Sequence, residues 1–210
     1  TEDNIIGVRM FYNIDAGTII MPNTAVEIGN YAFYKNAAIT SIDLNGVTSI
    51  GNYAFAECEG LLALDLKLVK TLGNYAFYKC SNIKTLDLGD VESLGSHVFW
   101  SASSVTSLTL PDSLKTVSSY AFSGLTSLTY LDIGKGVTTI YENGFYACTA
   151  LETLVIPDNV AKISEYAFRD CTALKSIRIG KGLTSLAAYA FWDCTKVTDI
   201  YYNAVNCNSS

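Results

Sequence analysis

One unit, repeated along the 210-residue chain, reads Leu151-Glu152-Thr153-Leu154-Val155-Ile156-Pro157 and then, after residues 158–162, Ile163-Ser164-Glu165-Tyr166-Ala167-Phe168-Arg169-Asp170-Cys171. Its phenylalanine belongs to a register that holds all nine phenylalanines of the chain. The steps are 22 residues and then 23 residues, through Phe11, Phe33, Phe55, Phe77, Phe99, Phe122, Phe145, Phe168 and Phe191. A fixed period of this length indicates one small supersecondary unit stacked on itself, so we predict one continuous array.

Each repeat contains an apolar pair with one residue between its members. The pair lies nine and eleven residues after the phenylalanine, as in Leu64/Leu66, Leu86/Leu88, Leu154/Ile156 and Ile177/Ile179. This period of two is typical of a short strand with one buried face. Because no hairpin partner is close in the chain, we expect each strand to pair in parallel and in register with its copy in the next repeat.

Two further segments of each repeat carry apolar residues. One is a pair eight and five residues before the phenylalanine, such as Val69/Leu72, which predicts that the chain turns inward there. The other surrounds the phenylalanine, as in residues 73–80, and its apolar groups are spaced by one turn of helix. We therefore expect a short helical turn in every repeat.

The composition describes a folded chain with few charges. Half of the residues are apolar, 16% are charged and the net charge is −6. Phosphate backbones and anionic lipids require a basic stripe, and the chain has no Lys/Arg cluster, so we expect no nucleic-acid partner. The chain also has no run of 18 apolar residues, so we expect no membrane insertion. Residues 1–20 do not resemble a signal peptide, although a chain that opens at Thr1 is compatible with a trimmed form.

The quoted unit resembles the BspA-like, treponemal-type leucine-rich repeat, and the resemblance covers nearly the whole chain. It implies an α/β fold: a right-handed leucine-rich-repeat solenoid with a parallel β-sheet on one face and short helical turns on the other. We expect a single domain over residues 1–210, with 1–17 as a degenerate N-terminal repeat or cap and 203–210 as a C-terminal segment. Residues 96–102 depart from the pattern because they lack its cysteine.

Cysteine and histidine occupy positions that other repeats fill with packing residues. Five cysteines stand three residues after a phenylalanine, where other repeats have Asn36, Ala102 and Leu125, so we expect buried free thiols rather than a zinc site. Cys207 lies outside this column, and we expect a lone thiol there, with a disulfide to Cys194 as the alternative. His97, the one histidine, replaces a structural tyrosine. With no catalytic or metal-binding motif, the sequence predicts no enzyme activity, no cofactor and no metal.

The residue between the two buried strand positions must face outward, and this column contains the candidate binding residues. Its N-terminal part is acidic, and stacked carboxylates about 5 Å apart repel by about 1 kcal/mol in water. We therefore expect that the fold does not need them, and interpret them as a strip for a basic partner or a cation. The alternative is solvated aspartates relieved by Lys67 and Lys84. The C-terminal part is apolar and aromatic, as in protein interfaces. The candidates are Asp43, Asp65, Asp87, Asp132, Tyr130, Val155, Arg178 and Tyr201.

A second aromatic column follows the phenylalanines directly, at Tyr12, Tyr34, Tyr78, Trp100, Tyr146 and Trp192. We expect these rings to be partly exposed, where they either stack on sugars or shield the core. The predicted function is a non-enzymatic binding module, secreted or at the cell surface, that engages a host or matrix protein. The secreted location and the adhesive role are implied by the family resemblance. The alternatives are a structural spacer and a carbohydrate-binding surface protein.

Overall fold

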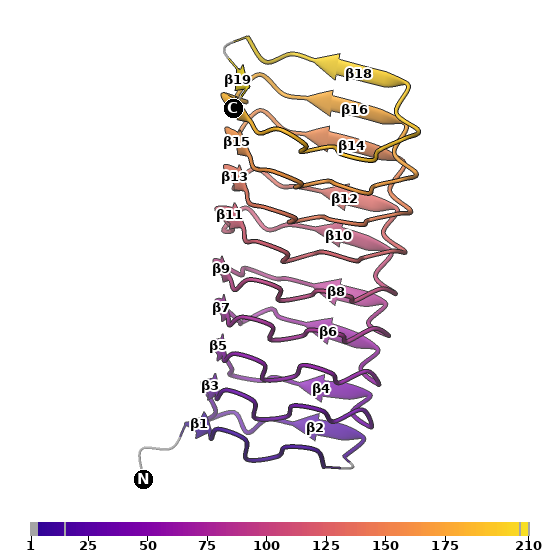
Figure 1. The fold of residues 1–210 in the computed structure, drawn as a ribbon. Helices are drawn as coiled ribbons and strands as arrows, with labels where there is room; N and C mark the ends of the chain where they lie inside the picture. The colour runs from indigo at the N-terminus through magenta and orange to yellow at the C-terminus, as the bar shows by residue number, and fades with distance from the viewer. Residues whose placement is uncertain (1–3, 15, 206, 210) are drawn as a thin grey trace.

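The computed structural model describes residues 4–14, 16–205 and 207–209, and shows a parallel β-solenoid of stacked rungs (Figure 1). Each rung has a strand on two of its sides and a turn segment, centred on the phenylalanine, between them. The repeats therefore form one stack, with the phenylalanines inside.

The predicted strands form the first ladder. Its pairing is parallel, with Leu64 opposite Leu86, Leu108 opposite Leu131 and Leu154 opposite Ile177, so the predicted register is confirmed for these pairs. The strands are β2 (Thr18–Ile20), β4 (Ser41–Asp43), β6 (Ala63–Asp65), β8 (Thr85–Asp87), β10 (Ser107–Thr109), β12 (Tyr130–Asp132), β14 (Thr153–Ile156), β16 (Ser176–Ile179) and β18 (Asp199–Tyr202). In β6, β8, β10 and β12 the middle residue is buried and its neighbours are exposed. The expected pairing of every strand with the next is not complete, because the ladder divides into the sheets β2-β4, β6-β8, β10-β12 and β14-β16-β18.

A second parallel ladder lies where the sequence predicted only that the chain turns inward. Its strands have two residues each, and the second residue of most of them is buried. The strands are β1 (Ile5–Ile6), β3 (Glu27–Ile28), β5 (Ser49–Ile50), β7 (Thr71–Leu72), β9 (Ser93–Leu94), β11 (Thr116–Val117), β13 (Thr139–Ile140), β15 (Lys162–Ile163), β17 (Ser185–Leu186) and β19 (Asn208–Ser209).

The predicted helical turns are wrong: the described residues contain no helix. In the turn segment the residues two before and two after the phenylalanine have left-handed backbones, as at Tyr75 (φ 57°) and Lys79 (φ 56°). A right-handed helix cannot pass through such residues. Their conformation instead points backbone donors at the next rung, where the N–H groups of Tyr75 and Lys79 bond to Ser96 O (2.9 Å) and Trp100 O (2.8 Å). Bonds between rungs thus replace bonds within a helix.

The core is a continuous stack of the nine phenylalanine rings. Neighbouring ring centres are 5.0–5.7 Å apart and the rings are tilted by at most 15°. The seven interior rings are fully buried, whereas Phe11 and Phe191, which each have one stacked neighbour, are partly exposed. Offset stacking of this kind adds to the hydrophobic stabilisation of each ring.

The cysteine column packs against this stack as free thiols, as predicted. The thiols of Cys58 and Cys80 donate to the carbonyl oxygens of Phe33 and Phe55, at 3.1 Å in both cases. Burial raises the pKa of Cys58 to about 12, so the group stays protonated. Cys194 and Cys207 are both free, so the alternative of a disulfide between them is wrong.

Candidate functional site

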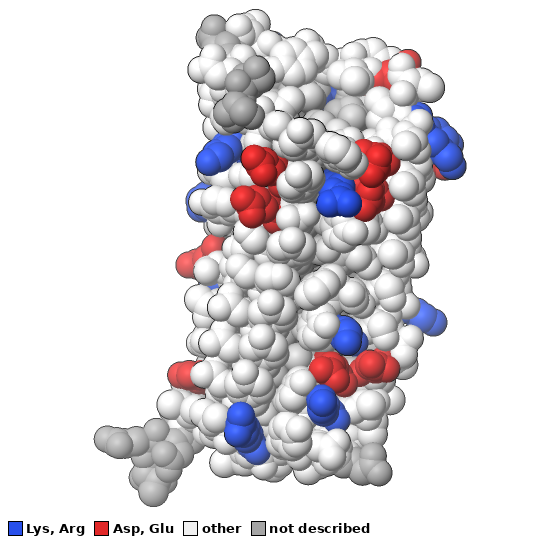
Figure 2. Space-filling view, in the orientation of Figure 1, with Lys and Arg blue, Asp and Glu red and all other residues white. Residues whose placement is uncertain are grey.

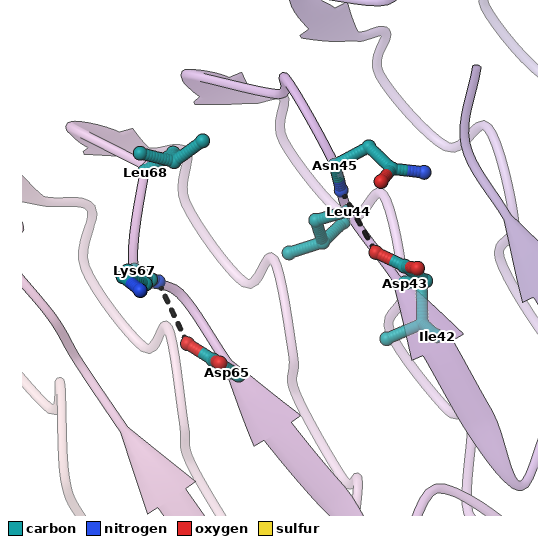
Figure 3. A pocket seen from close by; sticks show the side chains of 7 residues that line it. All are labelled: Ile42, Asp43, Leu44, Asn45, Asp65, Lys67 and Leu68. Carbon is teal, nitrogen blue, oxygen red and sulfur yellow. Dashed lines mark hydrogen bonds between the residues drawn. The ribbon is translucent and has the colours of Figure 1, made fainter. Parts of the chain in front are cut away.

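The four aspartates of the outward column end their strands through a local hydrogen bond. In each case carboxylate oxygen Oδ1 accepts the backbone N–H two residues further on: Asp43 from Asn45 (3.1 Å), Asp65 from Lys67 (2.9 Å), Asp87 from Gly89 (2.9 Å) and Asp132 from Gly134 (2.9 Å). Figure 3 shows the first two of these bonds. An aspartate that bonds its own backbone in this way favours a turn. The expectation that the fold does not need these carboxylates is therefore wrong.

The loop type explains three of the positions at which the column lacks aspartate. Ile20, Thr109 and Val155 occupy the same column, and the residue two further on is Pro22, Pro111 or Pro157. Proline has no N–H, so a carboxylate there would have no donor to accept from. In two of these loops the residue after the proline bonds the next rung instead. Oδ1 of Asp112 and of Asp158 accepts the N–H of Lys135 and of Lys181, both at 2.8 Å.

The N-terminal aspartates stay exposed beside a shallow hollow. The hollow measures about 360 Å³ and is lined by Ile42, Asp43, Leu44, Asn45, Asp65, Lys67 and Leu68 (Figure 3). Asp65 and Asp87 are direct neighbours across the ladder. Neither forms an ion pair with Lys67 or Lys84 within the described ranges. Among those residues, no three carboxylate, histidine or cysteine side chains are grouped as a metal site.

The remaining candidates gather on the C-terminal half of the same face. We call Tyr130, Asp132, Val155, Arg178 and Tyr201 the C-terminal patch. Val155, Arg178 and Tyr201 are direct register neighbours on β14, β16 and β18, as predicted from the period. The Arg178 guanidinium lies over the Tyr201 ring, 5.4 Å from its centre, which is a cation–π distance.

Part of this patch is hollowed. Tyr130, Asp132 and Val155 line a depression of about 200 Å³ together with Leu131, Ile133 and Pro157. The apolar members are well exposed, at 56% for Tyr130, 53% for Val155 and 52% for Tyr201. The structure thus brings five of the eight candidates together. It leaves Asp43, Asp65 and Asp87 on other rungs, beyond Thr109 of β10.

The turn-segment face carries a wall of aromatic rings. Tyr53, Tyr75, His97 and Tyr120 stack face to face, with centres 4.6, 4.4 and 4.6 Å apart. His97 thus takes the place of a structural tyrosine, as predicted, and burial lowers its pKa. The second column is partly exposed, as predicted, and Trp100 leans on Tyr78 at 5.1 Å. Figure 2 shows this face, where Lys/Arg and Asp/Glu form two groups with an uncharged stretch between them.

The stacking limits what these rings offer to a ligand. A sugar that stacks on an aromatic side chain needs the face of the ring, and the tyrosine column uses its ring faces for its own neighbours. Mainly ring edges and hydroxyl groups remain for contacts from outside. The geometry therefore favours packing between rungs over sugar stacking for this column. The second aromatic column instead makes tilted contacts, as between Tyr78 and Trp100 (41°), so its ring faces are not used in this way.

These features define a leucine-rich-repeat solenoid of the binding or structural kind. The family model for the BspA type leucine rich repeat region matches residues 4–103 and 92–209, in six copies. The chain therefore belongs to this family. No match was found among curated proteins.

Solved structures of bacterial leucine-rich-repeat proteins share the fold. A protein from Bacteroides ovatus is 21% identical with a TM-score of 0.60, over 94% of this chain and 64% of that chain. One from Eubacterium ventriosum is 22% identical with a TM-score of 0.53, over 94% and 69%. The T. pallidum leucine-rich-repeat protein is 22% identical with a TM-score of 0.51, over 90% and 71%. This chain thus spans less than two thirds of the Bacteroides protein.

Within the described residues, no helix has the length and apolar character needed to cross a bilayer.

Proposed function

We propose that this chain is a non-enzymatic binding module that engages a protein partner through the C-terminal patch. One observation carries the proposal: exposed Tyr130, Val155 and Tyr201 cluster around a hollow and an arginine, on a rigid sheet. The aspartates of the column are explained by their turns, whereas no loop geometry requires these apolar groups. Tyrosine and arginine are also enriched among the residues that contribute most to binding energy.

The depression beside Tyr130 has the size of one side chain rather than of a sugar chain. Its wall combines apolar surface from Val155 and Pro157 with the Asp132 carboxylate. Such a wall suits an apolar or basic side chain of a protein, while Arg178 offers a positive group one rung further on. The alternative of a pure spacer gives no reason for an apolar cluster at this place.

The family supports an extracellular role. Since BspA-like repeats are associated with secreted and cell-surface adhesion proteins, we propose the same location, with a host or matrix protein as partner. A fold of this kind hosts many ligands, so the patch, and not the fold, identifies the contact.

The test is a binding measurement with a panel of purified extracellular-matrix and serum proteins on immobilised chain. For any protein that binds, Val155→Lys and Arg178→Glu should each weaken binding at least about tenfold. Lys162→Glu reverses an exposed charge on the second ladder and serves as the matched control, with unchanged binding expected. Binding that is unaffected by both patch variants would show that the patch is not the contact, and a panel without any binder would favour the spacer.

A further inference from the structure

The second ladder is interrupted once within the described residues. The odd-numbered strands from β1 to β9 form one five-stranded sheet, and the odd-numbered strands from β11 to β19 form another. The interruption lies between Leu94, which ends β9, and Thr116, which begins β11. Figure 1 shows the two strands one above the other in the middle of the stack.

The change of repeat length coincides with this interruption. Leu88 lies five residues before the start of β9, whereas its counterpart Leu110 lies six residues before the start of β11. All later loops keep the longer form, and the ladder resumes at β13. The loop before β3 also has the longer form, and β3 still pairs with β5, whose loop is one residue shorter. The interruption at β11 therefore reflects the local contacts of this junction as well as the extra residue.

Two serine hydroxyls bridge the gap. At regular steps a backbone N–H makes the bond, as from Gly95 to Leu72 O (2.7 Å) and from Tyr141 to Val117 O (2.9 Å). At the interruption the equivalent acceptor, Leu94 O, is bonded by the hydroxyl of Ser118 at 2.7 Å. The hydroxyl of Ser113 bonds Val91 O at 2.8 Å on the other side of β9.

Other irregularities collect between the same two rungs. The distance between the Phe99 and Phe122 ring centres, 5.7 Å, is the largest in the phenylalanine stack. The thiol column is interrupted here by Ala102 and Leu125. Two of the three buried polar side-chain atoms without a partner, among the described residues, belong to His97 and Ser123.

The first ladder is also unpaired beside this interruption. Strand β8 pairs with β6 and strand β10 pairs with β12, whereas β8 and β10 lie in separate sheets. The two rungs remain joined in the turn segment, because the N–H groups of Phe99 and Ser101 donate to Ala121 O and Ser123 O, both at 2.9 Å. The contact is therefore complete in the turn segment and weakened on both ladders.

From these observations we propose that the β9–β11 junction is a joint between two cooperative units, the described residues of 4–102 and of 107–205, held on one side by Ser113 and Ser118. In a stacked array each repeat contacts only its neighbours, so the weakest interface decides where the array opens. Opening at this joint changes the angle between the aspartate-bearing half of the outward face and the C-terminal patch.

The first test is amide hydrogen exchange resolved to single residues. The N–H groups of Phe99 and Ser101 cross the joint, and those of Phe55 and Glu57 make the same bonds across a regular interface, at 2.8 and 2.7 Å. We expect exchange at the joint to be at least about tenfold faster in the wild-type protein. Equal protection of the two pairs would overturn the proposal.

Removal of the hydroxyls sharpens this test. The double variant Ser113→Ala/Ser118→Ala should speed exchange of Phe99 and Ser101 by about a further tenfold and leave Phe55 unchanged. Ser164→Ala is the matched control, because Ser164 occupies the column of Ser118 but its backbone N–H makes the regular bond, to Ile140 O at 2.9 Å. An equal effect of both changes at the joint would contradict the assigned role of Ser118.

The two tryptophans provide an independent readout, since Trp100 lies in the first unit and Trp192 in the second. In the double serine variant, urea unfolding followed through Trp100 (with Trp192→Phe) and through Trp192 (with Trp100→Phe) should give separate midpoints. Coincident midpoints there would show one cooperative unit and no joint.

Discussion

The carboxylate of Asp87 accepts a hydrogen bond of 2.9 Å from the backbone N–H of Gly89, and this bond ends strand β8. Gly89 has a φ of 51°, and a side chain at this residue would approach Lys67 Cα to 2.7 Å. The turn therefore depends on an acceptor at one position and on a glycine at the other. Asp43 and Asp65 accept the same bond from Asn45 and Lys67, so the column is acidic in three consecutive rungs where three such bonds follow one another.

Asp87→Ala should lower the free energy of unfolding by about 1 kcal/mol, because the N–H of Gly89 loses its partner. Asp87→Asn keeps an oxygen acceptor and removes the charge, so it should remain within about 0.5 kcal/mol of the wild type. Urea denaturation measures both. A loss of stability in the asparagine variant as large as in the alanine variant would assign the effect to charge rather than to the turn.

Val155→Asp should give no gain in stability, since Pro157 has no N–H to donate. The same change places a charge in the apolar part of the C-terminal patch, so binding of a partner identified by the panel should fall. Thermal unfolding and the binding measurement together check the prediction. An increase in the unfolding temperature would contradict the link between aspartate and loop type.

The phenylalanine stack should tolerate changes at its ends better than in its middle. Phe77→Ala removes a fully buried ring with two stacked neighbours and should cost about 3–5 kcal/mol. Phe191→Ala removes a partly exposed ring with one stacked neighbour and should cost less than half as much. Urea unfolding of the two variants makes the comparison, and equal costs would be inconsistent with the stack as described.

The thiol column should be chemically silent in the folded protein. Burial keeps the pKa of Cys58 at about 12 and that of Cys80 well above its usual value, so neither forms the reactive thiolate. Cys207, outside the column and partly exposed, should be the first thiol to react with a disulfide reagent. Counting modified thiols before and after denaturation should show the remaining five reacting only on unfolding. Fast labelling of Cys58 or Cys80 in the native state would contradict their burial.

The first ladder was predictable because packing alone defines it. Leu64 and Leu66 are buried while Ala63 and Asp65 are exposed, and this alternation is visible in the sequence. The second ladder has strands of two residues, so a single inward side chain such as Leu72 leaves no period to detect. Neighbours across rungs, and not local sequence, determine these short strands.

The prediction of helical turns in the turn segments failed for a related reason. Tyr75 and Lys79 are spaced like residues on one face of a helix, and neither is a glycine that would signal a left-handed backbone. A left-handed residue costs about 1–2 kcal/mol, which the bonds to the next rung offset. Only the stacked structure contains those bonds.

The candidate site, too, was predictable from the sequence only in part. The adjacency of Val155, Arg178 and Tyr201 followed from the register, whereas the hollow beside Tyr130 depends on the shape of the Pro157 loop. The turn role of the aspartates had a signal in the sequence: Asp43 and Asp87 precede Asn45 and Gly89 by two residues, whereas the column residues without a carboxylate at 20, 109 and 155 precede proline.

His97 should make stability depend on pH. It stacks between Tyr75 and Tyr120 and lies 5.3 Å from Trp100, and burial lowers its pKa below the usual 6.5. The folded protein therefore resists protonation that the unfolded chain accepts. The stability due to neutral His97 is fully present above pH 6.5 and is lost as the pH falls towards its lower folded-state pKa.

The variant His97→Tyr restores the residue of the column and cannot take up that proton. As the pH is lowered from about 8 to about 5, the variant should become more stable relative to the wild type in urea titrations. Parallel pH curves for the two proteins would show that His97 keeps its ordinary pKa in the fold.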